Sequence, residues 1–235
     1  MEEKLLLLGD QAIALGAVHA GLSGVYAYPG TPSTEITEYI QQCELALGRG
    51  VHSRWCTNEK TAMEAALGMS YVGKRALVCM KHVGLNVAAD AFVNSAMTGT
   101  NGGLVVLVAD DPSMHSSQNE QDSRFYGKFA FVPILEPSTQ QEAYDMMSYA
   151  FDLSERAQLP VLMRVTTRMA HSRAVVSLRP ERQGKDRRPC PAGCCCLLLR
   201  AGVIWRCSVS SLNWKKRPSL HRSIVLATEK IIHVV

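Results

Sequence analysis

The chain has 235 residues, 47% of them hydrophobic, and a formal net charge of +4. A chain of this length can bury a stable core in one large or two small domains without disulfide bonds. Its apolar runs are too short for a membrane span or a secretory signal, so we expect no membrane association and a cytoplasmic location. The charge is uneven, because residues 1–178 carry 13 Lys and Arg against 18 Asp and Glu, whereas residues 179–235 carry 12 against 3.

Residues 1–178 alternate between short apolar runs and segments with helical periodicity, starting with an apolar run at residues 4–8. The predicted helices lie at residues 10–20, 34–47, 57–68, 84–97 and 139–158. The predicted strands lie at residues 25–28, 52–55, 75–80, 104–109, 132–135 and 160–166. Strands without polar alternation are covered on both faces. The predicted fold class is therefore α/β, a parallel sheet with helices on both faces.

Four loops that follow predicted strands carry most of the candidate functional residues. The loops lie at residues 29–34, 57–60, 81–86 and 110–124. Ligands of parallel sheets bind at the carboxyl ends of the strands, so we expect the loops to meet at one edge. Their polar residues are Thr31, Glu59, Lys81, His82, Asn86, His115, Gln118, Asn119 and Arg124. Such convergence favours a binding site.

Each of these residues also has an ordinary structural explanation. Glu59 lies in the first turn of a predicted helix, where a carboxylate commonly caps the backbone amides. Arg124 has Asp122 and Glu120 nearby as possible ion-pair partners. Common catalytic motifs do not identify a reaction class, because the sequence contains no P-loop, GxGxxG, GxSxG or HExxH.

Three segments carry a resemblance to a known family. Residues 28–36, YPGTPSTEI, resemble the YPGTPSSEI segment of the 2-oxoacid:ferredoxin oxidoreductases. Residues 80–90 (MKHVGLNVAAD) and 108–122 (VADDPSMHSSQNEQD), with the sequence NEK at Glu59, are similar to the indolepyruvate:ferredoxin oxidoreductase alpha subunit. The resemblance extends over roughly residues 1–178, and implies that they form the aminopyrimidine-binding domain of a thiamine diphosphate enzyme.

The resemblance implies roles for the loop residues. Glu59 matches the glutamate that hydrogen-bonds N1′ of the aminopyrimidine and helps to activate the cofactor. Cofactor-binding positions are implied for Lys81, His82, Gly84 and Asn86. Positions toward the 2-oxo acid are implied for Thr31, Arg124 and His115, and the planar fork of an arginine suits a carboxylate.

The family reaction is the oxidative decarboxylation of aryl pyruvates such as indolepyruvate to acyl-coenzyme A, with electrons passed through 4Fe–4S clusters to ferredoxin. The implied partners are therefore the 2-oxo acid, coenzyme A, ferredoxin and the beta subunit of the same enzyme. The chain lacks the GDG motif that marks the Mg²⁺ and diphosphate domain, and the CxxCxxCxxxCP spacing of the cluster ligands. We therefore expect it to supply only the aminopyrimidine half of the site and to be inactive alone.

Two alternatives stay open. The chain is a non-catalytic domain that acts by associating with a partner subunit, or it belongs to a related 2-oxoacid oxidoreductase with another substrate. Titration of thiamine diphosphate distinguishes the first of these from a cofactor-binding domain.

Residues 179–235 have no helical or strand periodicity that continues the sheet, and five of the eight cysteines lie within residues 190–207. The break predicts a poorly ordered basic tail that is not native to the family, as a frameshift or misjoined reading frame produces. A zinc site from Cys190, Cys194, Cys207 and His221 is disfavoured because no CxxC pair exists. No recognised nucleic-acid module is present, and no metal ligand is predicted in residues 1–178.

Overall fold

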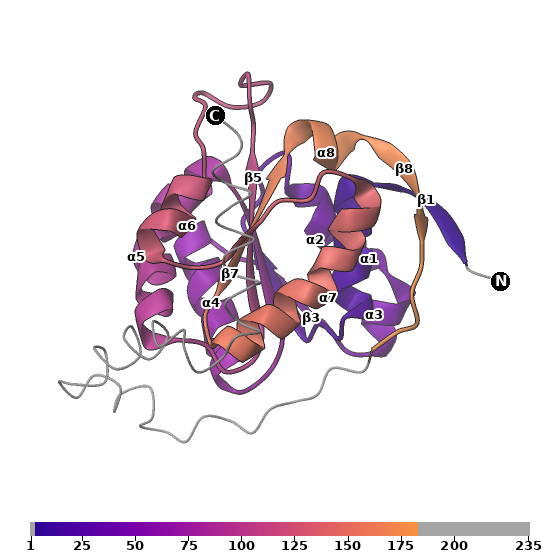
Figure 1. Ribbon diagram of the computed structural model, residues 1–235, viewed down its shortest axis with the longest axis horizontal. Coiled ribbons are helices and arrows are strands. Elements are labelled where there is room, and N and C mark those ends of the chain that lie inside the picture. The colour runs from indigo at the N-terminus through magenta and orange to yellow at the C-terminus, as the bar shows by residue number, and fades with distance from the viewer. Residues whose placement is uncertain (1–2, 183–235) are drawn as a thin grey trace, which may run out of the picture.

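The structure is a computed structural model that describes residues 3–182. They form a six-stranded parallel sheet of order β3-β2-β4-β5-β7-β6 and a separate antiparallel ribbon of β1 and β8 (Figure 1). The strands are β1 (Lys4–Leu8), β2 (Gly24–Ala27), β3 (His52–Trp55), β4 (Ala76–Lys81), β5 (Leu104–Asp110), β6 (Ile134–Leu135), β7 (Val161–Thr166) and β8 (Arg173–Ser177). The helices are α1 (Gly9–His19), α2 (Thr34–Gln42), α3 (Glu44–Gly48), α4 (Glu59–Tyr71), α5 (His82–Thr98), α6 (Arg124–Ala130), α7 (Gln140–Ala157) and α8 (Thr167–His171).

The sheet separates two hydrophobic cores. Along β4, Leu77 and Cys79 pack with α1, α2 and α7, whereas Val78 and Met80 pack with α4 and α5 on the other face. Figure 1 shows these two helix layers on opposite sides of the strands. Successive strand residues point to opposite faces, so a strand buried on both sides is apolar throughout. The predicted parallel sheet with helices on both faces is confirmed.

Three local features differ from the sequence prediction. The predicted helix over residues 34–47 is divided into α2 and α3, because Cys43 leaves helical geometry at φ −71° and ψ 115°. Helix α6, which begins at Arg124 where the predicted loop at residues 110–124 ends, was not predicted. The elements α8 and β8 were not predicted.

The β1–β8 ribbon joins the two ends of the described chain. Its register runs from Lys4 opposite Ser177 to Leu8 opposite Arg173, and Val176 packs on Tyr144 of α7. Arg182 still contacts the domain, because its amide donates to His19 O at 2.8 Å.

The predicted tail, with its cysteines and candidate zinc ligands, lies outside the described residues from position 183 onward. The division at residue 178 stays a prediction. Within residues 3–182, no helix has both the length and the apolar character that a bilayer crossing requires.

Candidate functional site

The loops after β2, β3, β4 and β5 meet at the carboxyl edge of the sheet, as expected for neighbouring parallel strands. Lys81, at the end of β4, donates from Nζ to Ser116 O at 2.6 Å. The Ser116 hydroxyl in turn lies 3.4 Å from Thr31 O. Three of the four predicted loops are thus in direct contact.

Glu59 is the first residue of α4, and it does not cap the helix. Asn58 does so, since its Oδ1 accepts from the Thr61 amide at 2.9 Å and from the Thr61 hydroxyl at 3.1 Å. The Glu59 side chain is half-buried, and within residues 3–182 no hydrogen bond or ion pair engages its carboxylate. The ordinary explanation of Glu59 as a cap is therefore wrong.

Gly84 sets the position of the Glu59 side chain. A Cβ atom at residue 84 would lie 2.5 Å from Glu59 Oε1 and 2.6 Å from its Cγ, closer than any real contact. Glycine at position 84 leaves room for the Glu59 side chain, which lies against the first turn of α5.

His82 and Asn86 connect α5 to the segments beyond β5. His82 is 1% exposed, and its Nε2 lies 3.1 Å from Asn119 O, while its Nδ1 has no hydrogen-bond partner among residues 3–182. The Tyr126 hydroxyl of α6 donates to Asn86 Oδ1 at 2.7 Å. In this structure both side chains hold neighbouring protein segments, so their predicted contact with a cofactor stays a prediction.

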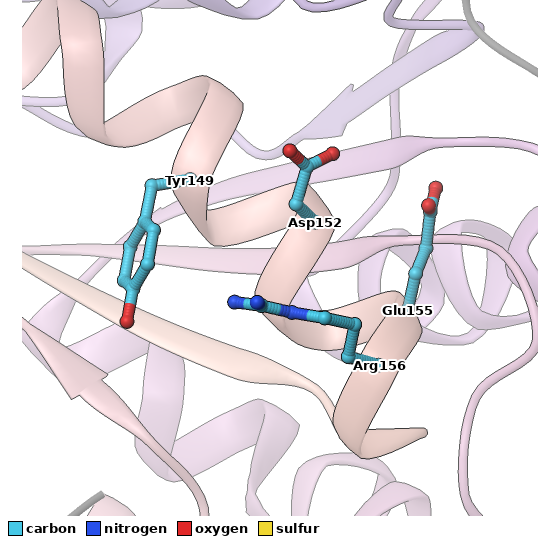
Figure 2. Close-up of a pocket in the computed structure, with 4 residues that line it drawn as sticks. All are labelled: Tyr149, Asp152, Glu155 and Arg156. Atoms are coloured by element: carbon cyan, nitrogen blue, oxygen red, sulfur yellow. The ribbon is translucent and has the colours of Figure 1, made fainter. Parts of the chain in front are cut away.

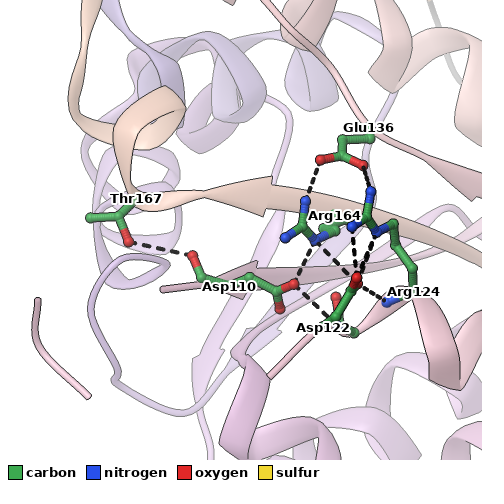
Figure 3. A network of polar contacts seen from close by, with 7 residues as sticks. Asp110, Asp122, Arg124, Glu136, Arg164 and Thr167 are labelled. Atoms are coloured by element: carbon green, nitrogen blue, oxygen red, sulfur yellow. Dashed lines mark hydrogen bonds and ion pairs between the residues drawn. The ribbon is translucent and has the colours of Figure 1, made fainter. Parts of the chain in front are cut away.

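Arg124, the first residue of α6, lies in a network of charges (Figure 3). Its guanidinium bonds both Asp122 oxygens, with Nη2 at 2.6 Å, and Glu136 at 3.3 Å. Beside it, buried Arg164 of β7 bonds Asp110 at 2.5 Å and also Glu136. The ion pair with Asp122 that the sequence offered as an alternative is present.

Sequence reasoning missed this network. The signal available was Arg164 itself, a charged residue within the apolar strand predicted at residues 160–166. A buried arginine requires a carboxylate partner, but nothing in the sequence identifies Asp110.

The loop between β5 and α6 is organised around Asp111. Its carboxylate accepts hydrogen bonds from the Ser116 amide at 2.7 Å, the Ser117 hydroxyl at 2.6 Å and the Thr167 hydroxyl at 2.8 Å. Burial raises the pKa of Asp111, but these hydrogen bonds outweigh it and hold the pKa well below its ordinary value. The carboxylate therefore fixes the loop that carries His115.

Thr31 and His115 have exposed side chains at this edge. Both residues make contacts through the backbone: Thr31 O accepts from the Ser116 hydroxyl, and the His115 amide donates to Asp111 Oδ1 at 3.2 Å. Among residues 3–182, neither side chain has a hydrogen-bond or ion-pair partner, and the role of both in substrate binding stays a prediction.

A hollow of about 310 Å³ on α7 lies away from this edge (Figure 2). It is lined by Tyr149, Asp152, Glu155 and Arg156. Arg75, directly before β4, bonds Asp152 and Glu155 at 2.6 and 2.7 Å, which places the hollow at the amino ends of the strands. None of the candidate site residues lines it.

Comparisons with known proteins agree with the geometry. Residues 15–191 match the family model "Pyruvate flavodoxin/ferredoxin oxidoreductase, thiamine diP-bdg". The chain is 54% identical over 176 residues to indolepyruvate oxidoreductase subunit IorA of Pyrococcus horikoshii, covering 75% of this chain and 27% of that one. Identity to IorA of Archaeoglobus fulgidus is 52% over 178 residues, covering 75% of this chain and 29% of that one.

More distant relatives share the fold. The 2-oxoglutarate synthase subunit KorA of Methanothermobacter marburgensis is 28% identical over 185 residues, 76% of this chain and 48% of that one. A solved 2-oxoglutarate:ferredoxin oxidoreductase from Magnetococcus marinus, with 2-oxoglutarate, coenzyme A and succinyl-CoA bound, superimposes with a TM-score of 0.65. It is 23% identical, over 77% of this chain and 32% of that one. The chain thus spans between a quarter and a third of its IorA relatives, and it belongs to the pyruvate flavodoxin/ferredoxin oxidoreductase family through its thiamine diphosphate-binding domain.

Proposed function

We propose that this chain supplies the aminopyrimidine-binding half of the thiamine diphosphate site of an indolepyruvate:ferredoxin oxidoreductase. The observation that carries the proposal is the Glu59 carboxylate, half-buried at the carboxyl edge, seated on Gly84 and free of protein partners within residues 3–182. Identity of 54% to an indolepyruvate oxidoreductase subunit, against 28% to a 2-oxoglutarate synthase subunit, supports an aryl pyruvate as the substrate.

The residues present fit the cofactor that the family implies. Thiamine diphosphate, when bound, supplies the carbon nucleophile that adds to the 2-oxo acid. The carboxyl group of Glu59 would exchange a proton with a nitrogen of the aminopyrimidine ring. Because Asn58 caps α4, this exchange costs the helix no hydrogen bond.

The other loop residues take supporting roles in the proposal. Lys81, His82 and Asn86 hold the loop at residues 111–123 and α6 against the start of α5, which shapes the cavity beside the cofactor. Thr31, His115 and Arg124 face the 2-oxo acid. The longest hydrogen bond of the Arg124 guanidinium is the one from Nη1 to Glu136, at 3.3 Å. Because this bond is the weakest, Nη1 is the nitrogen that can most readily bind a substrate carboxylate instead.

The complete reaction that we propose is oxidative decarboxylation of the aryl pyruvate to its acyl-coenzyme A, with electrons leaving through 4Fe–4S clusters to ferredoxin. The Mg²⁺ and cluster ligands, and the beta subunit, belong to polypeptide other than residues 3–182. The solved relative with coenzyme A and succinyl-CoA bound supports coenzyme A as a reactant. A cytoplasmic location remains a prediction.

Calorimetric titration of thiamine diphosphate and Mg²⁺ into the 235-residue chain tests the proposal. We expect weak binding, because half of the site is on other polypeptide, and loss of that binding in Glu59→Ala. Glu64→Ala is the matched control, since Glu64 is an exposed residue of the same helix. Binding that is equal in the wild type and in Glu59→Ala, or measurable decarboxylation of indolepyruvate by the chain alone, contradicts the proposal.

A second candidate function is a non-catalytic domain that acts through a partner subunit. The aromatic residues Phe125, Phe129 and Phe131, at 70%, 70% and 87% exposure, favour a protein contact at α6. Under this function the chain co-elutes with the beta subunit and Glu59→Ala leaves co-elution unchanged, while thiamine diphosphate does not bind.

A further inference from the structure

A second group of ionisable side chains lies where α1, α2 and α8 meet, in the helix layer opposite α4 and Glu59. It consists of Asp10, Glu35 and His171, and the nearest potential ligand atoms of all three lie within 4.8 Å of one another. His171 Nε2 is 3.6 Å from Glu35 Oε1. The sequence did not point to these residues, because they are 25 or more positions apart and lie on three different helices.

Asp10 is the residue that requires an explanation. It is 1% exposed, and within the described part of the chain neither carboxylate oxygen has a hydrogen-bond partner; Glu35 Oε2 is also buried there without one. Burying an unpaired carboxylate is unfavourable, because it loses its hydration without gaining a partner. Burial, and then the charge of Glu35, raises the pKa of Asp10.

The surrounding backbone holds Asp10 firmly. A Cβ atom at Gly9 would lie 2.1 Å from Met169 O, so the start of α1 is in direct contact with α8. The Gly9 amide donates to Ser172 O at 3.1 Å, and Gln140 of α7 donates to the same oxygen at 3.1 Å. One side of the cluster is therefore rigid.

The other side of the cluster is open to solvent. The side chains of Glu35 and His171 are 38% and 39% exposed. An ion about 2.1 Å from each ligand requires ligand atoms roughly 3 to 4 Å apart, so small rotations of these two exposed side chains are sufficient. Solvent also gives the ion a route to Asp10.

We propose that Asp10, Glu35 and His171 bind a divalent transition-metal cation. Two carboxylates neutralise its charge, the imidazole supplies a third ligand, and water completes the coordination. Oxygen and imidazole ligands of this kind suit Mn²⁺ and Zn²⁺. The site is independent of the proposed thiamine diphosphate function, since it shares no residue with it.

Mn²⁺ is the probe of choice for the test. The cysteine-rich segment of the chain offers thiolates, which select Zn²⁺, whereas Mn²⁺ prefers carboxylate ligands. Mn²⁺ is titrated into the full chain without thiamine diphosphate, and free Mn²⁺ is followed by electron paramagnetic resonance. The wild type should bind one Mn²⁺.

Three variants locate the ion. Asp10→Asn keeps the shape of the side chain and removes its charge, and His171→Gln alters an exposed ligand. Each should raise the Kd at least about tenfold, because loss of even an outer-shell partner costs 10–100-fold in metal affinity. Glu38→Gln, an exposed position on the same helix as Glu35, should leave the Kd unchanged.

Thermal melts establish that each variant is folded. No depletion of free Mn²⁺ by the wild type overturns the proposal. A Kd unchanged in His171→Gln also overturns it, even if Asp10→Asn fails to fold.

Discussion

Glu59 and Asp110 both lie at the carboxyl edge of the sheet, yet their carboxylates have opposite surroundings. Asp110 is fully buried, and it bonds Arg164 at 2.5 Å and the Ser123 amide at 3.1 Å. Glu59 is half-buried, and its carboxylate has no partner within the described chain. A buried charge that is paired holds segments together, whereas an accessible charge left unpaired is available to a ligand.

Removing Arg164 should have the largest effect. Arg164→Met leaves Asp110 buried without its cation, and loss of one partner of a buried pair costs about 3–5 kcal/mol. Urea unfolding of the full chain measures the loss. The double variant Asp110→Asn, Arg164→Met should recover part of it, and a loss below about 1 kcal/mol in the single variant would show that Asp110 is not held by this pair.

Gly84→Ala should separate binding from stability. The new methyl group meets the Glu59 carboxyl and displaces it, so thiamine diphosphate binding should fall at least about tenfold, or about 1.4 kcal/mol. Stability should change little, because the preference of a helix for alanine over glycine, about 0.5–1 kcal/mol, offsets the cost of displacing the Glu59 side chain.

Gly68→Ala is the matched control for Gly84→Ala. It lies within α4, and a Cβ atom there meets nothing within 4 Å. It should gain stability and keep binding. If both glycine variants bind thiamine diphosphate equally well, the position of the Glu59 carboxyl group does not affect binding.

The carboxylate of Asp111 differs from those of Glu59 and Asp110, because neutral hydrogen-bond donors hold it in place of a cation. Its pKa is lowered in the folded state, so its contribution is complete above the ordinary aspartate pKa of about 3.9 and is lost as the pH falls below that value. The free energy of unfolding should therefore decrease between pH 5 and pH 3, and decrease less in Asp111→Asn. Asp90→Asn, at an exposed position of α5, should follow the wild type.

Arg124→Ala should have the smallest effect on stability. Its pairs with Asp122 and Glu136 involve side chains that are about one-third exposed, and such pairs contribute up to about 1 kcal/mol. Urea unfolding should give a small loss that disappears in 1 M NaCl. A loss as large as that of Arg164→Met would place Arg124 among the buried, paired charges.

The sheet was predictable because its strands can be recognised from their residues alone. Val105 to Val108 point alternately into two cores and are all apolar, so the sequence indicates a strand covered on both faces. Their parallel order then places the four loops at one edge, and Glu59 follows from its position after β3.

What the sequence did not predict depends on contacts between distant residues. Helix α6 contains Gly127, which weakens its helical signal, and the close approach of Ile134 and Leu162 explains that glycine only once the fold is known. Strand β8 forms by pairing with β1, which lies near the other end of the described residues in the sequence. Asn58, and not Glu59, is the cap of α4, a choice between neighbours that spacing cannot make.

The antiparallel ribbon also determines how the domain responds to a pull on its two ends. Lys4 faces Ser177 at the outer end of the ribbon. Tension applied to the two chain segments that leave this end therefore opens the residue pairs one after another. Sequential opening needs far less force than shearing all pairs at once. Once the contact of Arg182 with His19 has broken, the ribbon opens as far as its last pair, Leu8 with Arg173, before the strands of the parallel sheet are stretched directly.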